Sequence, residues 1–294
     1  MAVLSLTVTP AQSGRTVLSL LKRELGLSTS CVNRLKRAER GITVNGSRVF
    51  TSAVLSAGDI LAVDLSAAEQ PTQVTPVEMP LDIFFEDEHL LILNKSAPLA
   101  VIPSSLSPDE ATLANGLSHY LGKDFSFHPV NRLDRGTTGL MVVAKSGFIH
   151  DKLRQKLHSG SFFRRYLAVC EGHPEPSSGE INLPIGRKEG SAIERCVTAD
   201  GQPSRSTYRT LEETARFSLV ELTPHTGRTH QLRVHMAAVG HPLAGDWLYG
   251  TEDRDLIPRP ALHAAFLSLH HPITGELIEL TAPLPADMKR LLEL

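Results

Sequence analysis

A proline-containing segment at residues 67–80 divides the chain into two parts of unequal size. It carries three prolines among alanine, glutamine and threonine, with few side chains that could pack into a core. Such a composition is typical of a linker between domains. We therefore predict a small domain at residues 1–66 and a larger one at residues 81–294, which is long enough to bury a sizeable core.

The first part of the chain combines strand-like and helical patterns. Apolar side chains recur at helical spacing in two stretches, and Asn45-Gly46 lies between two short apolar segments, as in a hairpin. The predicted strands cover residues 3–8, 42–44 and 60–65, and the predicted helices cover residues 16–25 and 29–38. The small domain is therefore expected to be α+β.

Strand-like apolar runs dominate the larger part, and helical patterns separate some of them. The runs cover residues 90–93, 140–144, 166–170, 206–211, 217–222 and 264–269, and the helical patterns cover residues 112–121, 148–157 and 229–239. No internal repeat interrupts this order. We predict an α+β domain built on a large mixed or antiparallel sheet.

The charge of the chain limits the partners it can bind. The net charge is -2, so the protein is not a generally basic nucleic-acid binder, and any surface for RNA must be local. Residues 1–70 hold eight Lys and Arg against five Asp and Glu, whereas residues 71–130 hold two against eight. The basic part of the chain is thus its N-terminal end.

The cysteines and the apolar runs argue against an exported or membrane protein. Cys31, Cys170 and Cys196 form no C-x-x-C pair, which predicts neither a disulfide framework nor a thiolate zinc site. No apolar run approaches the roughly 18 residues of a membrane span, and the first residues lack a basic leader. We expect a cytoplasmic protein without membrane contact.

A first chemically informative stretch covers residues 131–139, just before an apolar strand. Asp134 lies in this Gly- and Thr-rich loop with Arg132 and Arg135 on either side. A carboxylate between two guanidinium groups suggests a functional site. The alternative is a structural Asp that caps the backbone amides of a turn.

A second stretch covers residues 222–235, where a Thr226-Gly227 turn leads into a helical pattern. Arg228 follows that turn, so a guanidinium and free backbone N–H groups could together hold a carboxylate or phosphate. The alternative is a capped helix start with a surface arginine. Histidines at 225, 230, 235 and 241 are spaced by five or six residues, which does not place neighbours on one helix face for metal binding.

A third stretch, residues 162–169, interleaves aromatic residues with arginines at the start of a strand. This pattern suits base stacking beside phosphate contacts, with Tyr166 as the candidate platform. The alternative is an ordinary aromatic residue of a sheet. A serine hydrolase is not indicated, because the chain has no G-x-S-x-G motif.

Taken together, the three stretches resemble the RluA-type family of RNA pseudouridine synthases in order and spacing. The family's active-site motif, approximately H-R-L-D-x-x-T-S-G followed by an apolar strand and A-K, is matched at residues 131–145. Asn131 stands where the family usually has His, and Thr138 where it usually has Ser. The family's tyrosine motif is similar to residues 164–172, and its T-G-R-x-H-Q motif is similar to residues 226–250.

This resemblance covers about residues 80–290 and implies an enzyme that isomerises uridine to pseudouridine in structured RNA. It favours ribosomal RNA of the large subunit, with transfer RNA as a second possibility, and implies no cofactor and no metal. A monomer is expected. The implied site residues are the catalytic Asp134, its cationic partner Arg228, the stacking platform Tyr166, and the substrate-contacting Arg132 and Leu232.

The N-terminal part separately resembles the S4-like, or alpha-L, RNA-binding domain. The residues that carry this resemblance are the hairpin at 41–46 and the Gly58-Asp59 turn after the two helical patterns. The resemblance implies an RNA-binding surface, for which the candidates are Arg34, Lys36, Arg37 and Arg40. The alternative is that these side chains form a merely solvated helix face.

The chemistry leaves some alternatives open. An ionised carboxylate near the ribose could add to C1′ or remove the C2′ proton, and the sequence does not distinguish these routes. A binding-only assembly factor is the main alternative function, although Asp134, Tyr166 and Arg228 are intact. A metal-dependent nuclease is disfavoured because the sequence has no clustered carboxylates to hold a divalent ion.

Overall fold

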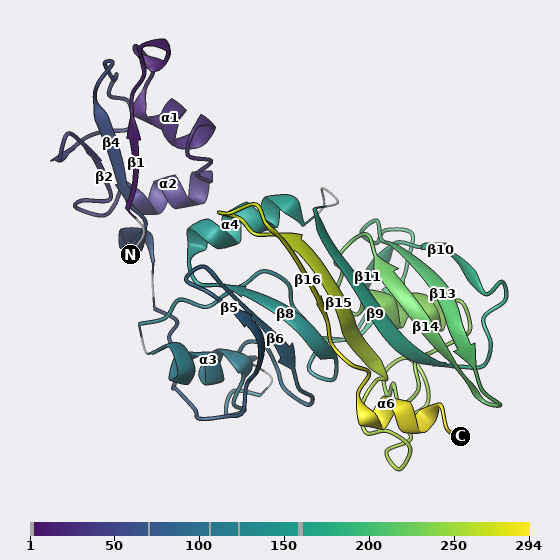
Figure 1. Cartoon of the computed structure of the whole chain (residues 1–294). Coiled ribbons are helices and arrows are strands. Elements are labelled where there is room, and N and C mark those ends of the chain that lie inside the picture. The colour runs from purple at the N-terminus through teal and green to yellow at the C-terminus, as the bar shows by residue number, and fades with distance from the viewer. Residues whose placement is uncertain (1–2, 70, 106, 123, 158–160) are drawn as a thin grey trace.

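The structure is a computed structural model that describes residues 3–69, 71–105, 107–122, 124–157 and 161–294. Figure 1 shows a small N-terminal unit, residues 3–68, beside a larger main unit that begins at residue 81. Within the described ranges, no helix is long and apolar enough to cross a membrane.

A four-stranded antiparallel sheet and two helices form the N-terminal unit. Each helix begins at a side-chain cap: Thr16 accepts the N–H of Ser19, and Ser28 accepts the N–H of Cys31. The strand order is β1-β4-β2-β3. The elements are β1 (Val3–Thr7), η1 (Pro10–Gln12), α1 (Val17–Arg23), α2 (Thr29–Leu35), β2 (Ile42–Val44), β3 (Ser47–Arg48), β4 (Ile60–Asp64) and η2 (Leu65–Ala68). The strands and helices predicted for this part are confirmed.

A ten-stranded sheet forms the framework of the main unit, in the order β10-β13-β14-β9-β15-β8-β6-β5 with β16 beside β15 and β7 beside β8. The strands are β5 (Asp82–Glu86), β6 (Leu90–Lys95), β7 (His128–Pro129), β8 (Thr138–Ala144), β9 (Phe162–Glu171), β10 (Ser178–Asn182), β13 (Arg205–Glu213), β14 (Phe217–Pro224), β15 (Leu262–His270) and β16 (Leu277–Thr281). Among the strands that the structure describes in this sheet, only β8 and β15 pair in parallel. The predicted α+β fold with a large mixed sheet is confirmed.

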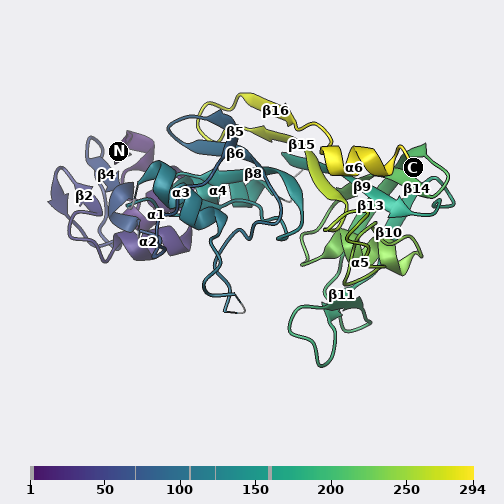
Figure 2. The same cartoon turned by 90° about the horizontal axis from the view of Figure 1, so that it is seen from below.

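The remaining elements of the main unit lie around this sheet. They are α3 (Leu113–Leu121), α4 (Gly147–Lys156), α5 (Gln231–Ala238), α6 (Ala286–Leu291), and the two-stranded hairpin of β11 (Ile185–Arg187) and β12 (Arg195–Val197). The hairpin projects away from the sheet (Figure 2).

The parallel contact between β8 and β15 depends on one glycine. Gly139 has φ +114°, and a Cβ at this position would lie 2.4 Å from the Ala264 carbonyl oxygen. No other residue could keep the two backbones this close. The loop that immediately precedes β8, which carries Asp134, is therefore held against the centre of the sheet.

Apolar side chains cover both faces of the central strands. In β6, Leu90 and Ile92 belong to one core cluster, whereas Leu91 and Leu93 belong to another. This alternation follows from the two-residue period of a strand. The first cluster faces α4 and the second contains buried residues of α3, α5 and the Asp134 loop.

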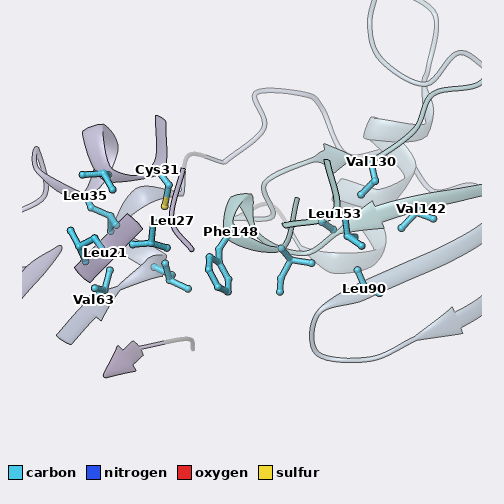
Figure 3. Close-up of a cluster of buried hydrophobic side chains, with 14 of the residues drawn as sticks. Leu21, Leu27, Cys31, Leu35, Val63, Leu90, Val130, Val142, Phe148 and Leu153 are labelled. Carbon is cyan, nitrogen blue, oxygen red and sulfur yellow. The ribbon is translucent and has the colours of Figure 1, made fainter. Parts of the chain in front are cut away.

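The first of these clusters continues from the main unit into the N-terminal unit. Leu27 and Cys31 lie near Phe148 of α4, and the cluster extends on to Leu35 and Val63 (Figure 3). The two units therefore share a continuous apolar core.

The segment between the units is not a free tether. The Thr72 N–H donates to the Phe125 carbonyl, and the Val77 N–H donates to the Asn115 carbonyl. Glu69 accepts the N–H of Gly147 at 2.7 Å. The described part of the linker expected at residues 67–80 thus follows the main unit closely, because both backbone groups and side chains of this segment have partners there.

Candidate active site

Asp134 lies in a tight turn just before β8. The Thr137 N–H donates to the Asp134 carbonyl, and the buried Asn131 accepts the N–H of Val142 at 2.9 Å, which ties the start of this loop to the strand. The Asp134 side chain is 29% exposed. Among the residues that the structure describes, no backbone amide donates to its carboxylate, which argues against the structural-cap alternative.

Asn131 has a local role that the sequence did not indicate. It was expected to replace a histidine ring, but its amide is buried and bonded to the backbone of β8 through Val142 and Leu140. The residue thus fixes the loop that carries Asp134.

The Asp134 carboxylate faces a cleft of about 1040 Å³. Its walls come from the Asp134 loop, α4, β9 and the segment that enters α5. The five predicted site residues are all among the lining residues: Arg132, Asp134, Tyr166, Arg228 and Leu232. The structure thus brings the three predicted segments together at one cleft.

Arg233 is the cationic partner of Asp134. Its Nη1 lies 3.7 Å from Asp134 Oδ2, while its Nε and Nη2 donate to the two oxygens of Asp246, each at 2.7 Å. Asp246 is fully buried. Burial opposes the charge on Arg233, but the Asp246 carboxylate outweighs it and raises the pKa of the guanidinium above its ordinary value. The cation is therefore both permanent and fixed in orientation.

The expectation that Arg228 pairs with Asp134 was wrong. Arg228 is exposed, and its Nε donates to the Pro203 carbonyl at 3.2 Å. The reason is where the helix begins: α5 starts at Gln231, so its first turn aims Arg233 at Asp134 and leaves Arg228 in the preceding turn at the cleft rim. The signal available in the sequence was the acidic Asp246, since an arginine on a buried helix face needs a carboxylate partner.

Tyr166 is 6% exposed and lines the cleft. Burial raises its pKa, so the phenol keeps its proton. Its ring also belongs to the core cluster that contains Leu133 and Leu232. The residue thus fits both interpretations made from the sequence, because a sheet aromatic packs there against the wall of the cleft.

Two further side chains near Asp134, Lys95 and His230, were missed from the sequence. Lys95 is 1% exposed, and its Nζ donates to the carbonyls of Ser96 and Leu99 at 2.8 Å. Burial lowers the pKa of Lys95 to about 7, against the attraction of Asp134. His230 lies with its Nε2 4.0 Å from Asp134 Oδ1, and its Nδ1 is 2.8 Å from the Tyr249 hydroxyl.

The other motif histidines have partners within the protein. His235 contacts the Ser206 hydroxyl and the Leu183 carbonyl, and His241 contacts the Glu171 carbonyl. Over the described parts of the chain, no group of three or more His, Cys, Asp or Glu could hold a metal ion. Hydrogen bonding is thus the visible role of these histidines.

The basic residues of the N-terminal unit lie apart from the cleft. Lys36, Arg37 and Arg40 are exposed, whereas Arg34 is half-buried and donates to Ser30. The helix α4 lies between them and the cleft, because Phe148 packs in the shared core while Arg154 lines the cleft.

The chain is similar to known proteins over most of its length. Residues 89–238 match the family described as RNA pseudouridylate synthase. An uncharacterized RNA pseudouridine synthase of Bacillus subtilis, YjbO, is 41% identical over 92% of this chain and 96% of its own. Ribosomal large subunit pseudouridine synthase D of Yersinia pestis is 36% identical over 85% of this chain and 82% of its own.

A solved structure gives the same result. Human RNA Pseudouridylate Synthase Domain Containing 1 superimposes with a TM-score of 0.57 and 29% identity, over 69% of this chain and 83% of that one. The matched family region contains the Asp134 loop, Tyr166 and the entry to α5. The chain belongs to the RNA pseudouridylate synthase family.

Proposed function

We propose that this enzyme converts specific uridines to pseudouridine in structured RNA, with ribosomal RNA of the large subunit as the favoured substrate and Asp134 as the catalytic residue. The observation that carries the proposal is the partly exposed Asp134 carboxylate in a large cleft, with Arg233 fixed 3.7 Å from it. The similarity to a large-subunit synthase supports the choice of RNA. Transfer RNA is the second candidate substrate.

The reaction breaks the bond between N1 of uracil and C1′, turns the retained base, and joins its C5 to C1′. The C5 proton is released to solvent and N1 takes up a proton, so the isomerisation involves no net oxidation or reduction, and the proposal invokes neither a metal nor a cofactor. An ionised carboxylate beside the ribose supplies the chemistry, either by adding to C1′ or by removing the C2′ proton. In either route the Asp134 carboxylate must be aimed at the ribose, which the fixed Arg233 cation favours.

The cleft suits a nucleotide that has left its stack. Its volume of about 1040 Å³ is at the upper end of the roughly 300–1000 Å³ typical of small-molecule sites. Tyr166 offers a ring face for the extruded base, and Leu232 gives an apolar wall. The exposed Arg132 and Arg228 at the cleft rim are suited to phosphate contacts.

The proposal includes an S4-like RNA-binding domain at residues 1–66 and a catalytic domain at residues 81–294, acting as a cytoplasmic monomer. Exposed Lys36, Arg37 and Arg40 support the RNA-binding role, because they follow one another closely at the end of α2 with Glu39 as the one acidic residue among them. Half-buried Arg34 contributes less to such a surface.

The decisive experiment compares pseudouridine maps of total RNA from cells with and without this gene. Loss of defined sites, restored by the wild-type gene and not by an Asp134→Asn gene, is the expected result. Sites that persist in the deletion strain, or that the Asn gene restores, would contradict the proposal and favour a binding-only assembly factor.

A further inference from the structure

A chain of polar contacts links the β11–β12 hairpin to the Asp134 carboxylate. The backbone N–H of Arg195 in β12 donates to the Tyr249 hydroxyl at 2.9 Å. That hydroxyl lies 2.8 Å from His230 Nδ1, and His230 Nε2 lies 4.0 Å from Asp134 Oδ1. The series of contacts therefore ends on Oδ1 of Asp134, whereas Arg233 contacts Oδ2 at 3.7 Å.

The hydrogen atoms along this series of polar contacts can be assigned from its donors and acceptors. A phenol has a single proton, and with the Tyr249 oxygen accepting from Arg195 we assign that proton to the bond with His230 Nδ1. Burial raises the pKa of Tyr249, which keeps the phenol protonated. With Nδ1 as an acceptor, the proton of the neutral imidazole must be on Nε2, the nitrogen that faces Asp134.

The backbone of His230 has an unusual conformation, which neighbouring hydrogen bonds hold in place. Its φ is 56°, a left-handed conformation that few non-glycine residues adopt. The surrounding turn is fixed because the Gln231 side chain accepts from both Thr226 and the Arg228 backbone, and Val234 donates to the His230 carbonyl. Unfavourable backbone conformations of this kind persist where the surrounding structure over-determines them, often at functional sites.

We propose that His230 is a positioning residue for the reaction: Tyr249 fixes its tautomer with N–H on Nε2, and this N–H holds Oδ1 of Asp134 while Arg233 holds Oδ2. The inference rests on the proposed catalytic role of Asp134. At 4.0 Å the contact is electrostatic, and contacts of this kind shorten to hydrogen bonds when substrate closes the site. The carboxylate is then oriented from both sides.

The proposal requires a neutral His230. Burial lowers its pKa, and the guanidinium groups of Arg233 and Arg195 act in the same direction, against the carboxylates of Asp134 and Asp246. Protonation would place an N–H on Nδ1, where the Tyr249 hydrogen already points. Activity should therefore fall as the pH falls through the lowered pKa of His230, and replacing Tyr249 by Phe should move this fall to higher pH because the neutral form loses its hydrogen bond.

The first test reads the tautomer directly in the free full-length protein. Imidazole ¹⁵N spectra at pH 8 should show His230 with a protonated Nε2, its signals being identified by their loss in His230→Asn. Tyr249→Phe should add the Nδ1–H tautomer. A wild-type His230 with its proton on Nδ1, or a tautomer unchanged by Tyr249→Phe, would overturn the inference. This measurement needs no RNA, so it is independent of the proposed function.

The second test measures turnover and its pH profile by release of tritium from C5 of labelled uridine in RNA. His230→Asn, which tolerates a left-handed backbone, should lower kcat about 10-fold or more and change KM little. Tyr249→Phe should lower kcat less and shift the acid limb upward. Tyr120→Phe is the matched control, because the Tyr120 hydroxyl is exposed and bonds Glu86 away from the cleft.

The outcomes distinguish failure of the positioning role of His230 from failure of the proposed function. An active wild type, an inactive Asp134→Asn, and wild-type kcat and pH profile in both Tyr249→Phe and His230→Asn would overturn the positioning role alone. Absence of tritium release from every variant and from wild type would contradict the proposed function, while the ¹⁵N spectra would still decide the tautomer.

Discussion

Replacing Arg233 by Lys should impair this enzyme far more than the same change at Arg228. Three nitrogens of Arg233 are committed, two to Asp246 at 2.7 Å and one toward Asp134 at 3.7 Å. A lysine has one nitrogen and cannot reproduce this planar fork. At Arg228 the guanidinium is exposed and bonds a single carbonyl, that of Pro203, so a lysine there keeps the charge and loses little else.

The size of the effect follows from the burial of Asp246. One of its two bonds to Arg233 is lost in the Lys variant, and water cannot replace it at a fully buried carboxylate. A hydrogen bond to a charged group contributes about 1.5–3 kcal/mol, which is the expected drop in the free energy of unfolding. Turnover should fall about 100-fold, the cost of misplacing a reacting group by about 1 Å.

Tritium release at saturating RNA measures the turnover, and urea unfolding measures the stability and shows that the variant is folded in the assay. Arg233→Lys should then show both losses, whereas Arg228→Lys should keep turnover within about threefold of wild type and change mainly the RNA affinity. Equal losses in the two variants, or a larger loss at Arg228, would refute the assignment of Arg233 as the partner of Asp134.

Three other changes test the remaining roles. Asp134→Asn should abolish tritium release while RNA affinity stays near wild type, because the amide keeps the shape and lacks the charge; residual turnover above a few per cent would contradict the catalytic role. Tyr166→Phe should keep RNA affinity and Tyr166→Ala should lose about 1–3 kcal/mol of binding along with turnover, measured by titration and tritium release; an Ala variant equal to wild type would leave Tyr166 a packing residue. Changing Lys36, Arg37 and Arg40 together to Gln should weaken RNA binding and reduce the salt dependence of log affinity, with kcat unchanged. If the variant and wild type have the same RNA affinity at every salt concentration, these residues do not bind the RNA.

The sheet and its helices were largely predictable because their signals are local. Runs such as residues 140–144 are continuous and apolar, and β8 is buried on both faces as that pattern requires. Short or half-exposed elements escaped detection. The hairpin of β11 and β12 has three residues in each strand, and β16 alternates exposed and half-buried positions without a strong apolar run.

The site was only partly predictable, because its contacts join distant residues. The Asp134 loop and Tyr166 could be placed in one site through the motifs that carry them. The partner of Asp134 was harder to choose: Asp246 hinted at a charged residue on α5, but deciding between Arg228 and Arg233 requires the residue at which α5 begins, and helix ends are poorly marked in sequence. The contact between His230 and Tyr249 likewise depends on a left-handed residue that no pattern indicates.

The apolar core that joins the two units fixes the distance between the N-terminal unit and the cleft. Because Leu27 packs near Phe148 and Glu69 bonds the start of α4, the N-terminal unit cannot swing as a tethered arm would. An RNA bound by Lys36, Arg37 and Arg40 would then place in the cleft only those nucleotides that lie at a fixed distance from the bound segment. Selection among uridines would then follow from the spacing of RNA features as well as from the bases beside the target.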